Sequence, residues 1–315
     1  MSQNQTSQNS ILFSSAVEQF LFAKRSQRLS NHTIRDYERT FRRFSETLPK
    51  DLPVSEITPF HIRRFLASLT CSKKTLLNTH VGLSSLWSWM VKENLCQSNI
   101  MKKVDRPRPE IRAIIPFSQD EVKKLFASIK WSSTYSRPGK RETSHRLKDY
   151  FRSRAIMLVL LDTGMRASEL CGLRFSDFID RSRIRVFGKG SKERILPLSP
   201  ATTRAIDDYV KYERIKIQDQ GEYIFVTANG KKMRADDLYH RISKIGERAG
   251  IHSHPHRFRH TFAINFLRNG GDIYSLQAML GHSSLEMVKR YLAIARADVE
   301  MAHRKASPVI NWCLE

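Results

Sequence analysis

The chain has 315 residues, of which 40% are hydrophobic, and this length is more typical of two domains than of one or three. Lysine and arginine number 54 against 31 aspartate and glutamate, so the net charge of +23 predicts an anionic partner, with nucleic acid ahead of an anionic membrane surface. The longest apolar run, AIMLVLL, is far shorter than the roughly 18 residues of a membrane span. Four scattered cysteines argue against a disulfide framework or a zinc site and are expected to be reduced thiols in a cytosolic protein.

Residues 11–104 have the apolar spacing of helices throughout. It is present in ILFSSAVEQFLFAKR and again in HTIRDYERTFRRFSETL, where Ile34, Tyr37, Phe41 and Phe44 share one face. Ser30 and Asn31, just before this second segment, are the expected N-cap. TPFHIRRFLASL, with proline at its first helical position, and SKKTLLNTHVGLSSLWSWMVKENL, capped by Ser72, predict two further helices. These segments predict a small helical bundle.

Two segments beside this bundle lack helical spacing. Residues 1–10, MSQNQTSQNS, are polar and uncharged, and we expect them to form a disordered leader. Residues 105–117 contain three prolines and no apolar period, which is typical of an extended linker. The second domain is therefore expected to span residues 118–315.

The second domain combines helices with a few strands. Helices are predicted in SQDEVKKLFASI, where Ser118, Asp120 and Glu121 suit an N-terminus, in the apolar DYFRSRAIMLVLLDTG, and along most of the chain after residue 234. RIRVFGKGSKERILPL predicts a β-hairpin, and EYIFVTANGKKM is expected to add a third strand. Residues 131–147, WSSTYSRPGKRETSHRL, are expected to be an exposed basic loop. The predicted fold class is mainly α with a small antiparallel β-sheet.

The stretch HSHPHRFRH, residues 252–260, suggests either a metal site or an anion site. Structural zinc sites commonly include cysteine or carboxylate ligands, and none lies nearby, whereas two arginines would repel a cation. If a helix begins near residue 255, then His256, Arg259 and His260 share one face at a helix N-terminus, where anions are favoured. An arginine fork beside a titratable histidine suits a phosphate. A solvated polar helix start is the remaining alternative.

Five boxes of the sequence occur in the order and spacing of a known family. They are TGMRASELCGL, GKGSKER, PHRFRH, LGH and a tyrosine nine residues after LGH. With these boxes the chain resembles the tyrosine recombinases, also called the phage-integrase family, over nearly its whole length. The resemblance implies a two-domain architecture, with a helical DNA core-binding domain ahead of a mixed α/β catalytic domain. It implies the catalytic residues Arg166, Lys189, His256, Arg259, His282 and the nucleophile Tyr291, with Glu169 orienting the site.

The implied roles agree with the chemistry of each side chain. The two arginines would clamp the non-bridging oxygens of a DNA phosphodiester, and His282 would donate a further hydrogen bond to them. Lys189, on the hairpin, is the expected general acid for the leaving 5′-oxygen. His256 is the expected acid/base aid near Tyr291, whose attack would leave a 3′-phosphotyrosine. No metal and no other cofactor is expected, because arginines replace the cation of other phosphoryl-transfer sites.

The other histidines of HSHPHRFRH have less specific interpretations. His260 is expected to be structural, on a neighbouring part of the same helix face, and His252 and His254 have no expected role. Taken alone, Tyr291 in MVKRYLAIA would be read as an ordinary half-buried aromatic residue.

The helical domain has polar helix starts that could contact DNA. RLSNHTIR and SKKT place basic and hydroxyl groups where they would reach phosphates or base edges, with a solvated polar face as the equal alternative. Binding should depend strongly on salt. The expected DNA-contacting residues are Arg28, Asn31, Arg35, Lys73, Lys74 and Thr75.

The resemblance also implies an assembly. Expected partners are double-stranded DNA with specific recombination sites, a homotetramer acting through a Holliday junction, and accessory DNA-bending or partner recombinase proteins, with no membrane. The segment after Tyr291 ends in an apolar strip and is expected to dock on a neighbouring protomer in C-terminal tail exchange. The expected location is the bacterial cytosol, with the protein on the nucleoid when it is bound to DNA.

Within the family, two biological roles compete. The basic loop at residues 131–147 favours an integrase or transposition recombinase of a mobile genetic element, and an Xer-type recombinase that resolves chromosome or plasmid dimers is the alternative. A type IB topoisomerase-like relaxing activity would use the same chemistry. Outside the enzymes, the alternative is a DNA-binding protein that keeps the fold without catalysis.

Overall fold

The protein is described by a computed structural model that divides into two compact units, Met1–Arg112 and Ala113–Glu315. The leader at residues 1–10 and the basic loop, apart from its two end residues, lie outside the described residues, so both predictions stay open. The structure describes residues 11–49, 52–108, 113–131, 147–188, 193–217, 221–281, 285–295, 303 and 307–312.

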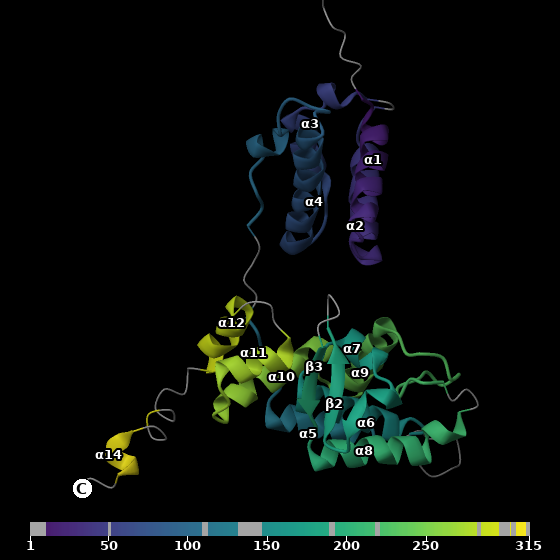
Figure 1. The fold of residues 1–315 in the computed structure, drawn as a ribbon, viewed down its shortest axis with the longest axis vertical. Helices are drawn as coiled ribbons and strands as arrows, with labels where there is room; N and C mark the ends of the chain where they lie inside the picture. Colours follow the sequence, from purple (N-terminus) through teal and green to yellow (C-terminus); the bar gives the residue numbers. More distant parts are fainter. Residues whose placement is uncertain are drawn as a thin grey trace, which may run out of the picture. The chain divides into compact units, whose positions relative to one another are not determined.

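The first unit is a bundle of α-helices, drawn from purple to blue in Figure 1. Two of its helices begin as the sequence predicts, because Ser30 and Ser72 each accept a hydrogen bond from the backbone N–H three residues on. Trp87 and Phe44 are almost completely buried in its aromatic core. The elements are α1 (Phe13–Ser26), α2 (Asn31–Ser45), η1 (Val54–Glu56), α3 (Pro59–Ser68), α4 (Lys73–Lys92) and η2 (Ile100–Lys103).

The second unit is built around its buried helix α6 (Tyr150–Thr163), which packs against α8 and α10. The mainly helical fold class with a small antiparallel sheet is confirmed. The other helices are α5 (Gln119–Ser128), α7 (Ala167–Gly172), η3 (Phe175–Asp177), α8 (Pro200–Tyr212), η4 (Arg214–Lys216), α9 (Ala235–Ala249), α10 (Pro255–Arg268), α11 (Ile273–Leu280), α12 (Glu286–Ala295) and α14 (Pro308–Asn311).

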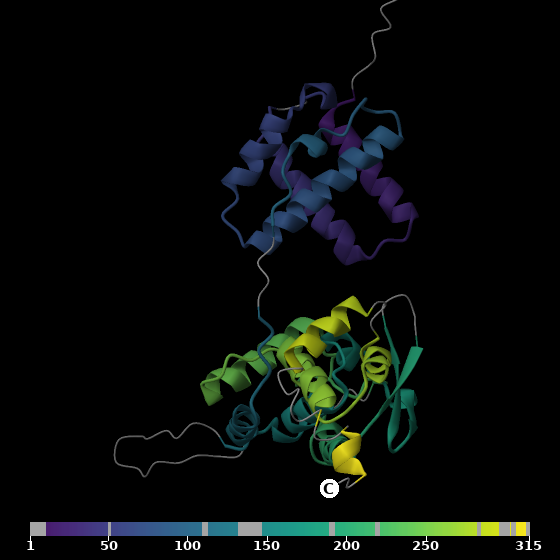
Figure 2. The same ribbon diagram turned by 90° about the vertical axis from the view of Figure 1, so that its left-hand side faces the viewer.

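The sheet has three antiparallel strands in the order β1 (Phe178–Asp180), β2 (Arg183–Phe187) and β3 (Glu193–Pro197). The predicted hairpin is present as β2 and β3, which lie at one edge of the unit in Figure 2. The prediction of a third strand in EYIFVTANGKKM is wrong. That segment forms only isolated bridges, because its backbone pairs with Arg174 and folds back on itself at the Asn-Gly turn.

A glycine ends α6 immediately before the first arginine box. Gly164 has a positive φ of 60°, and a Cβ placed there would lie 2.3 Å from Cδ1 of Phe262. Glycine alone adopts this left-handed conformation at little cost and leaves room for the aromatic ring. The chain can therefore turn sharply from α6 into α7, which brings the arginine box against α10. Within the described ranges, no helix is long and apolar enough to cross a bilayer.

Candidate active site

The first arginine box forms the junction of α6 and α7. Arg166 is the residue before α7, and its backbone N–H donates to Oε2 of Glu169 at 2.8 Å. Its guanidinium Nη1 also donates to Oε1 of Glu169, at 2.9 Å, and the side chain keeps about a third of its surface exposed. The short helix thus fixes the direction of Arg166 while leaving part of the guanidinium open to a ligand.

Glu169 is the buried anion of the site. Only 4% of its side chain is exposed, and its two oxygens also accept hydrogen bonds from Arg194 on β3, at 3.0 and 2.7 Å. Burial alone would raise the pKa of Glu169, but hydrogen bonds from Arg194 and from Arg166 hold it below its usual value. Glu169 is therefore a carboxylate that joins the arginine box to the hairpin, a geometry that suits the expected orienting role.

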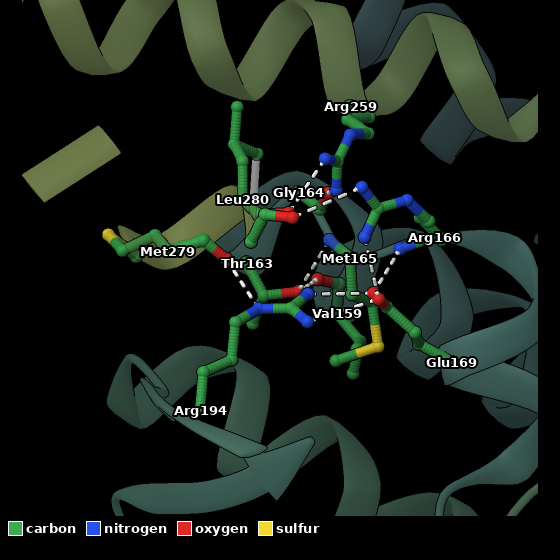
Figure 3. A network of polar contacts seen from close by, with 11 residues as sticks. Val159, Thr163, Gly164, Met165, Arg166, Glu169, Arg194, Arg259, Met279 and Leu280 are labelled. Atoms are coloured by element: carbon green, nitrogen blue, oxygen red, sulfur yellow. Dashed lines mark hydrogen bonds and ion pairs between the residues drawn. The ribbon is translucent and has the colours of Figure 1, made fainter. Parts of the chain in front are cut away.

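The C-terminal end of α11 is held by three arginines, as Figure 3 shows. The last carbonyls of a helix have no partner within the helix and carry partial negative charge, so guanidinium groups stabilise them. Because Arg166 directly precedes α7 while Arg194 lies on β3 and Arg259 in α10, these arginines join separate elements at one point. The contacts are Arg194 Nε to Met279 O at 2.8 Å, Arg259 Nη2 to Leu280 O at 2.8 Å and Arg166 Nη2 to Gly281 O at 3.4 Å.

Arg259 lies in α10 and is 1% exposed. Its Nη1 donates to the carbonyl of Gly164 at 2.7 Å, which ties α10 to the turn before the arginine box. Burial, together with the nearby charge of Arg166, lowers the pKa of Arg259 to about 10. The guanidinium remains charged at neutral pH. The positive charges of Arg166 and Arg259 thus lie close together, which suits the binding of one phosphate by both guanidinium groups.

Arg257, the other arginine of HSHPHRFRH, is directed to a different part of the unit. Its Nη2 donates to both carboxylate oxygens of Glu121 at the start of α5, at 2.8 and 2.9 Å. Its guanidinium also lies over the ring of Phe117. We therefore assign Arg257 to holding α5 against α10.

Tyr291 lies in α12 and is 2% exposed. Its hydroxyl lies 2.9 Å from Nδ1 of His260. The ring of His256 stacks on that of His260, with centroids 5.1 Å apart and planes 21° apart. Burial raises the pKa of Tyr291, while the positive charges of Arg259 and Arg290 act in the opposite direction. The phenol is therefore protonated at rest.

The position beside the tyrosine differs from the sequence-based expectation. That expectation placed His256 next to Tyr291 and treated His260 as structural, whereas the imidazole that lies within hydrogen-bond distance of the phenol is that of His260. Both histidines lie on one face of α10, so the sequence indicated the face, and the position of α12 selects which ring meets the phenol. Arg194 was also missed as a site residue, although it ends the GKGSKER box.

Two expected catalytic residues, Lys189 and His282, lie outside the described residues. The chain on either side of them is described. In the sequence, Lys189 falls between the end of β2 and the start of β3, and His282 is the residue after Gly281. Among the described residues, no group of three or more His, Cys, Asp or Glu side chains is placed to hold a metal ion.

All the expected DNA-contacting residues of the first unit are exposed. Those of SKKT form the first turn of α4, and those of RLSNHTIR lie in α2 and the turn before it. Arg28 has a positive φ of 54°, in the turn that separates α1 from α2. The structure thus leaves these side chains accessible at two helix starts, where a phosphate would also meet free backbone N–H groups.

Charged arginines near a buried, protonated tyrosine suit a class of site that transfers a phosphoryl group to a phenol. Comparison with known proteins agrees with this class. Residues 139–297 match the model of the Phage integrase family, and residues 17–97 match that of the Phage integrase, N-terminal SAM-like domain. The chain belongs to the tyrosine recombinase family, whose members cleave and rejoin DNA through a tyrosine intermediate.

Individual relatives cover most of the chain. Tyrosine recombinase XerD of Halalkalibacterium halodurans is 26% identical over 304 residues, which is 93% of this chain and 97% of that protein. Tyrosine recombinase XerC of Bacillus subtilis is 30% identical over 246 residues, 75% and 76% of the two chains. The crystal structure of a lambda integrase tetramer bound to a Holliday junction has the same fold, with a TM-score of 0.71 at 18% identity over 90% of this chain and 78% of that one.

Proposed function

We propose that this chain is a site-specific DNA recombinase in which Tyr291 attacks the scissile phosphate and becomes joined to the 3′ end of the cleaved strand. Arg166 and Arg259 bind the non-bridging oxygens, and His282 donates to the same oxygens. Lys189 gives a proton to the departing 5′-oxygen. Attack concentrates negative charge on the phosphate oxygens, and fixed cations lower the energy of that state.

The observation that carries this proposal is the shared position of the tyrosine and the arginines. The charges of Arg259 and Arg166 both act on the Tyr291 hydroxyl and oppose the effect of burial on its pKa. A phosphate that binds these two guanidinium groups would therefore lie next to the phenol oxygen. Burial and the charges of both arginines lower the pKa of His256 below the ordinary imidazole value. Its ring is therefore neutral at pH 7 and able to hydrogen-bond to the phosphate or exchange a proton with it.

The proposed partner is double-stranded DNA bound by both units. The net charge of +23 and the exposed helix starts of the first unit support it. We place the helical DNA-binding domain at residues 11–104 and the catalytic domain at 118–315. The division of the structure after Arg112 falls within the linker between them.

The proposed active assembly is a tetramer on a Holliday junction, as in the lambda integrase crystal structure with the same fold. We propose that the tail after Tyr291 docks on a neighbouring protomer. In its described part, Val309 in α14 and Trp312 directly after this helix are exposed, with 55% and 70% of their surfaces open. Apolar side chains of this size are typical of a segment that packs on another surface.

The biological role within the family has two candidates. The XerC and XerD relatives, at 26–30% identity, favour an Xer-type recombinase that resolves dimers of circular DNA. The basic loop at residues 131–147 favours the integrase of a mobile element. Both roles need the same strand chemistry, so the sites on which the protein acts distinguish them.

Mapping of covalent adducts on genomic DNA of the source organism tests both the chemistry and the role. Randomly nicked fragments are incubated with the protein, SDS-stable adducts are isolated, and the joined DNA is sequenced. A single short site in the chromosome would support the Xer-type role, and sites at the ends of an inserted element would support the integrase role. Adducts scattered without a shared sequence would contradict site specificity.

A further inference from the structure

His260 is in direct contact with the group that the proposed reaction uses as its nucleophile. Its Nδ1 lies 2.9 Å from the hydroxyl oxygen of Tyr291, which is the length of a normal hydrogen bond. The two rings are 5.6 Å apart between centroids. The tyrosine is 2% exposed, so little water reaches this hydroxyl. The geometry thus offers the phenol proton an acceptor within the protein.

The electrostatic surroundings decide which atom donates in this hydrogen bond. The groups facing His260 are His256, His254, Arg259 and Arg290, and burial together with these groups lowers the pKa of His260 to about 4. The imidazole is therefore neutral at pH 7. Burial also keeps the phenol protonated. The hydroxyl consequently donates, and Nδ1 accepts with an unprotonated lone pair.

We propose that His260 accepts the phenol proton of Tyr291 during strand cleavage and returns it during rejoining. This inference rests on the proposed recombinase function. As the bond from Oη of Tyr291 to phosphorus forms, the phenol proton moves to Nδ1 of His260 and the bond from phosphorus to the 5′-oxygen breaks. The 5′-oxygen takes a separate proton from the general acid, which the proposed function assigns to Lys189. Rejoining runs each transfer in reverse.

Binding of DNA would make His260 a better acceptor at the moment of reaction. Without DNA, Arg259 and the other cationic groups disfavour a second positive charge on the imidazole. A phosphodiester on the arginine clamp adds a negative charge close to them, and attack by the phenol increases it. The repulsion of the imidazolium therefore falls, and proton transfer becomes favourable only when the substrate is in place.

The two stacked imidazoles, those of His256 and His260, have different proton partners in the proposed reaction. His256 stacks on His260, and the charges of Arg259 and Arg166 help to lower the pKa of His256. His256 can therefore hydrogen-bond to the phosphate or exchange a proton with it, while His260 accepts the proton of the nucleophile. This assignment gives each ring a separate proton partner.

The test compares single-turnover cleavage of a nicked duplex by the wild type and by His260→Asn, whose amide keeps a hydrogen-bonding group near the phenol but cannot take up a proton. We expect a loss of about 10²–10⁴-fold, the usual contribution of a general base. DNA affinity should be unchanged. His252→Ala is the matched control, because this exposed histidine of the same stretch should cleave like the wild type.

The pH profile separates proton acceptance from a structural role. The wild-type rate should be nearly constant between about pH 6 and 8, because a neutral acceptor is in place. The rate of His260→Asn should rise roughly tenfold per pH unit, since its phenol must lose the proton to solvent before attack. A variant with a reduced rate but the wild-type pH profile would overturn the proposal.

A substrate with sulfur in place of the bridging 5′-oxygen shows on which side of the reaction His260 acts. A thiolate leaves without the proton that an alkoxide needs, so this substrate should rescue Lys189→Ala but not His260→Asn. Rescue of His260→Asn would assign His260 to the leaving group and refute the inference.

Two further results complete the test. If His260→Asn does not fold, as judged by thermal unfolding, His260→Gln is measured in its place with the same expectations. Cleavage by the folded variant within about threefold of the wild type would remove only this inference, whereas absence of any adduct with the wild type would remove the proposed function itself.

Discussion

Replacement of Glu169 by alanine should destabilise the catalytic unit far more than loss of an exposed ion pair. The carboxylate is 4% exposed and accepts hydrogen bonds from the backbone and guanidinium of Arg166 and from two nitrogens of Arg194. Arg194 is itself only 10% exposed, so the substitution leaves a buried cation without its anion. Removing one partner of a buried ion pair costs about 3–5 kcal/mol. We expect the free energy of unfolding to fall by that amount.

The matched control is Glu193→Ala, on the same strand as Arg194. Glu193 pairs with Arg185 at 2.9 Å, but nearly half of each side chain is exposed, so its loss should cost about 1 kcal/mol or less. The assay is hydrogen exchange at increasing urea, read on peptides from residues 150–280, because the two units need not unfold together. A cost for Glu169→Ala as small as that for Glu193→Ala would refute the reasoning.

Three further predictions follow from the site, the tail and the helix starts. The folded-state pKa of Glu169 is lowered, so the stabilisation by this carboxylate is present above the ordinary carboxyl pKa and is lost as the pH falls below that value. The stability difference between wild type and Glu169→Gln, measured by thermal unfolding, should therefore shrink below about pH 4. A difference that stays constant with pH would contradict a charged Glu169. Deletion of residues 305–315 should abolish cooperative binding to paired sites in gel-shift titrations, and unchanged cooperativity would refute tail docking. Replacing Arg35 and Lys74 by alanine should lower the slope of log affinity against log salt by about 2; an unchanged slope would show that neither side chain contacts a phosphate.

Features set by local sequence were predicted correctly. Helix starts at Ser30, Ser72 and Ser118 follow from a side chain that accepts a hydrogen bond within its own first turn. The hairpin of β2 and β3 follows from alternating apolar residues around a glycine turn. The partnership of Arg166 with Glu169 was also accessible, because the two residues are three positions apart at the start of one helix.

The features that escaped prediction depend on how distant segments meet. His260 and Tyr291 are 31 positions apart, and only the packing of α12 on α10 selects His260 over its neighbour His256. Arg194 reaches Glu169 and Met279 across 25 and 85 positions, so its role is decided by the position of the sheet. The same limit explains the wrongly predicted third strand, because an alternating pattern does not specify a partner.

Trapping of a covalent protein–DNA adduct on a nicked duplex tests the central claim most directly. The claim is that Tyr291 is the nucleophile that attacks a phosphate bound by Arg166 and Arg259. A nicked duplex loses a short fragment on cleavage, so rejoining fails and the adduct accumulates. We predict an SDS-stable protein–DNA adduct with the wild type, attached through the 3′ end of the cleaved strand, and none with Tyr291→Phe, which differs by one hydroxyl. An adduct that survives in Tyr291→Phe would contradict the account.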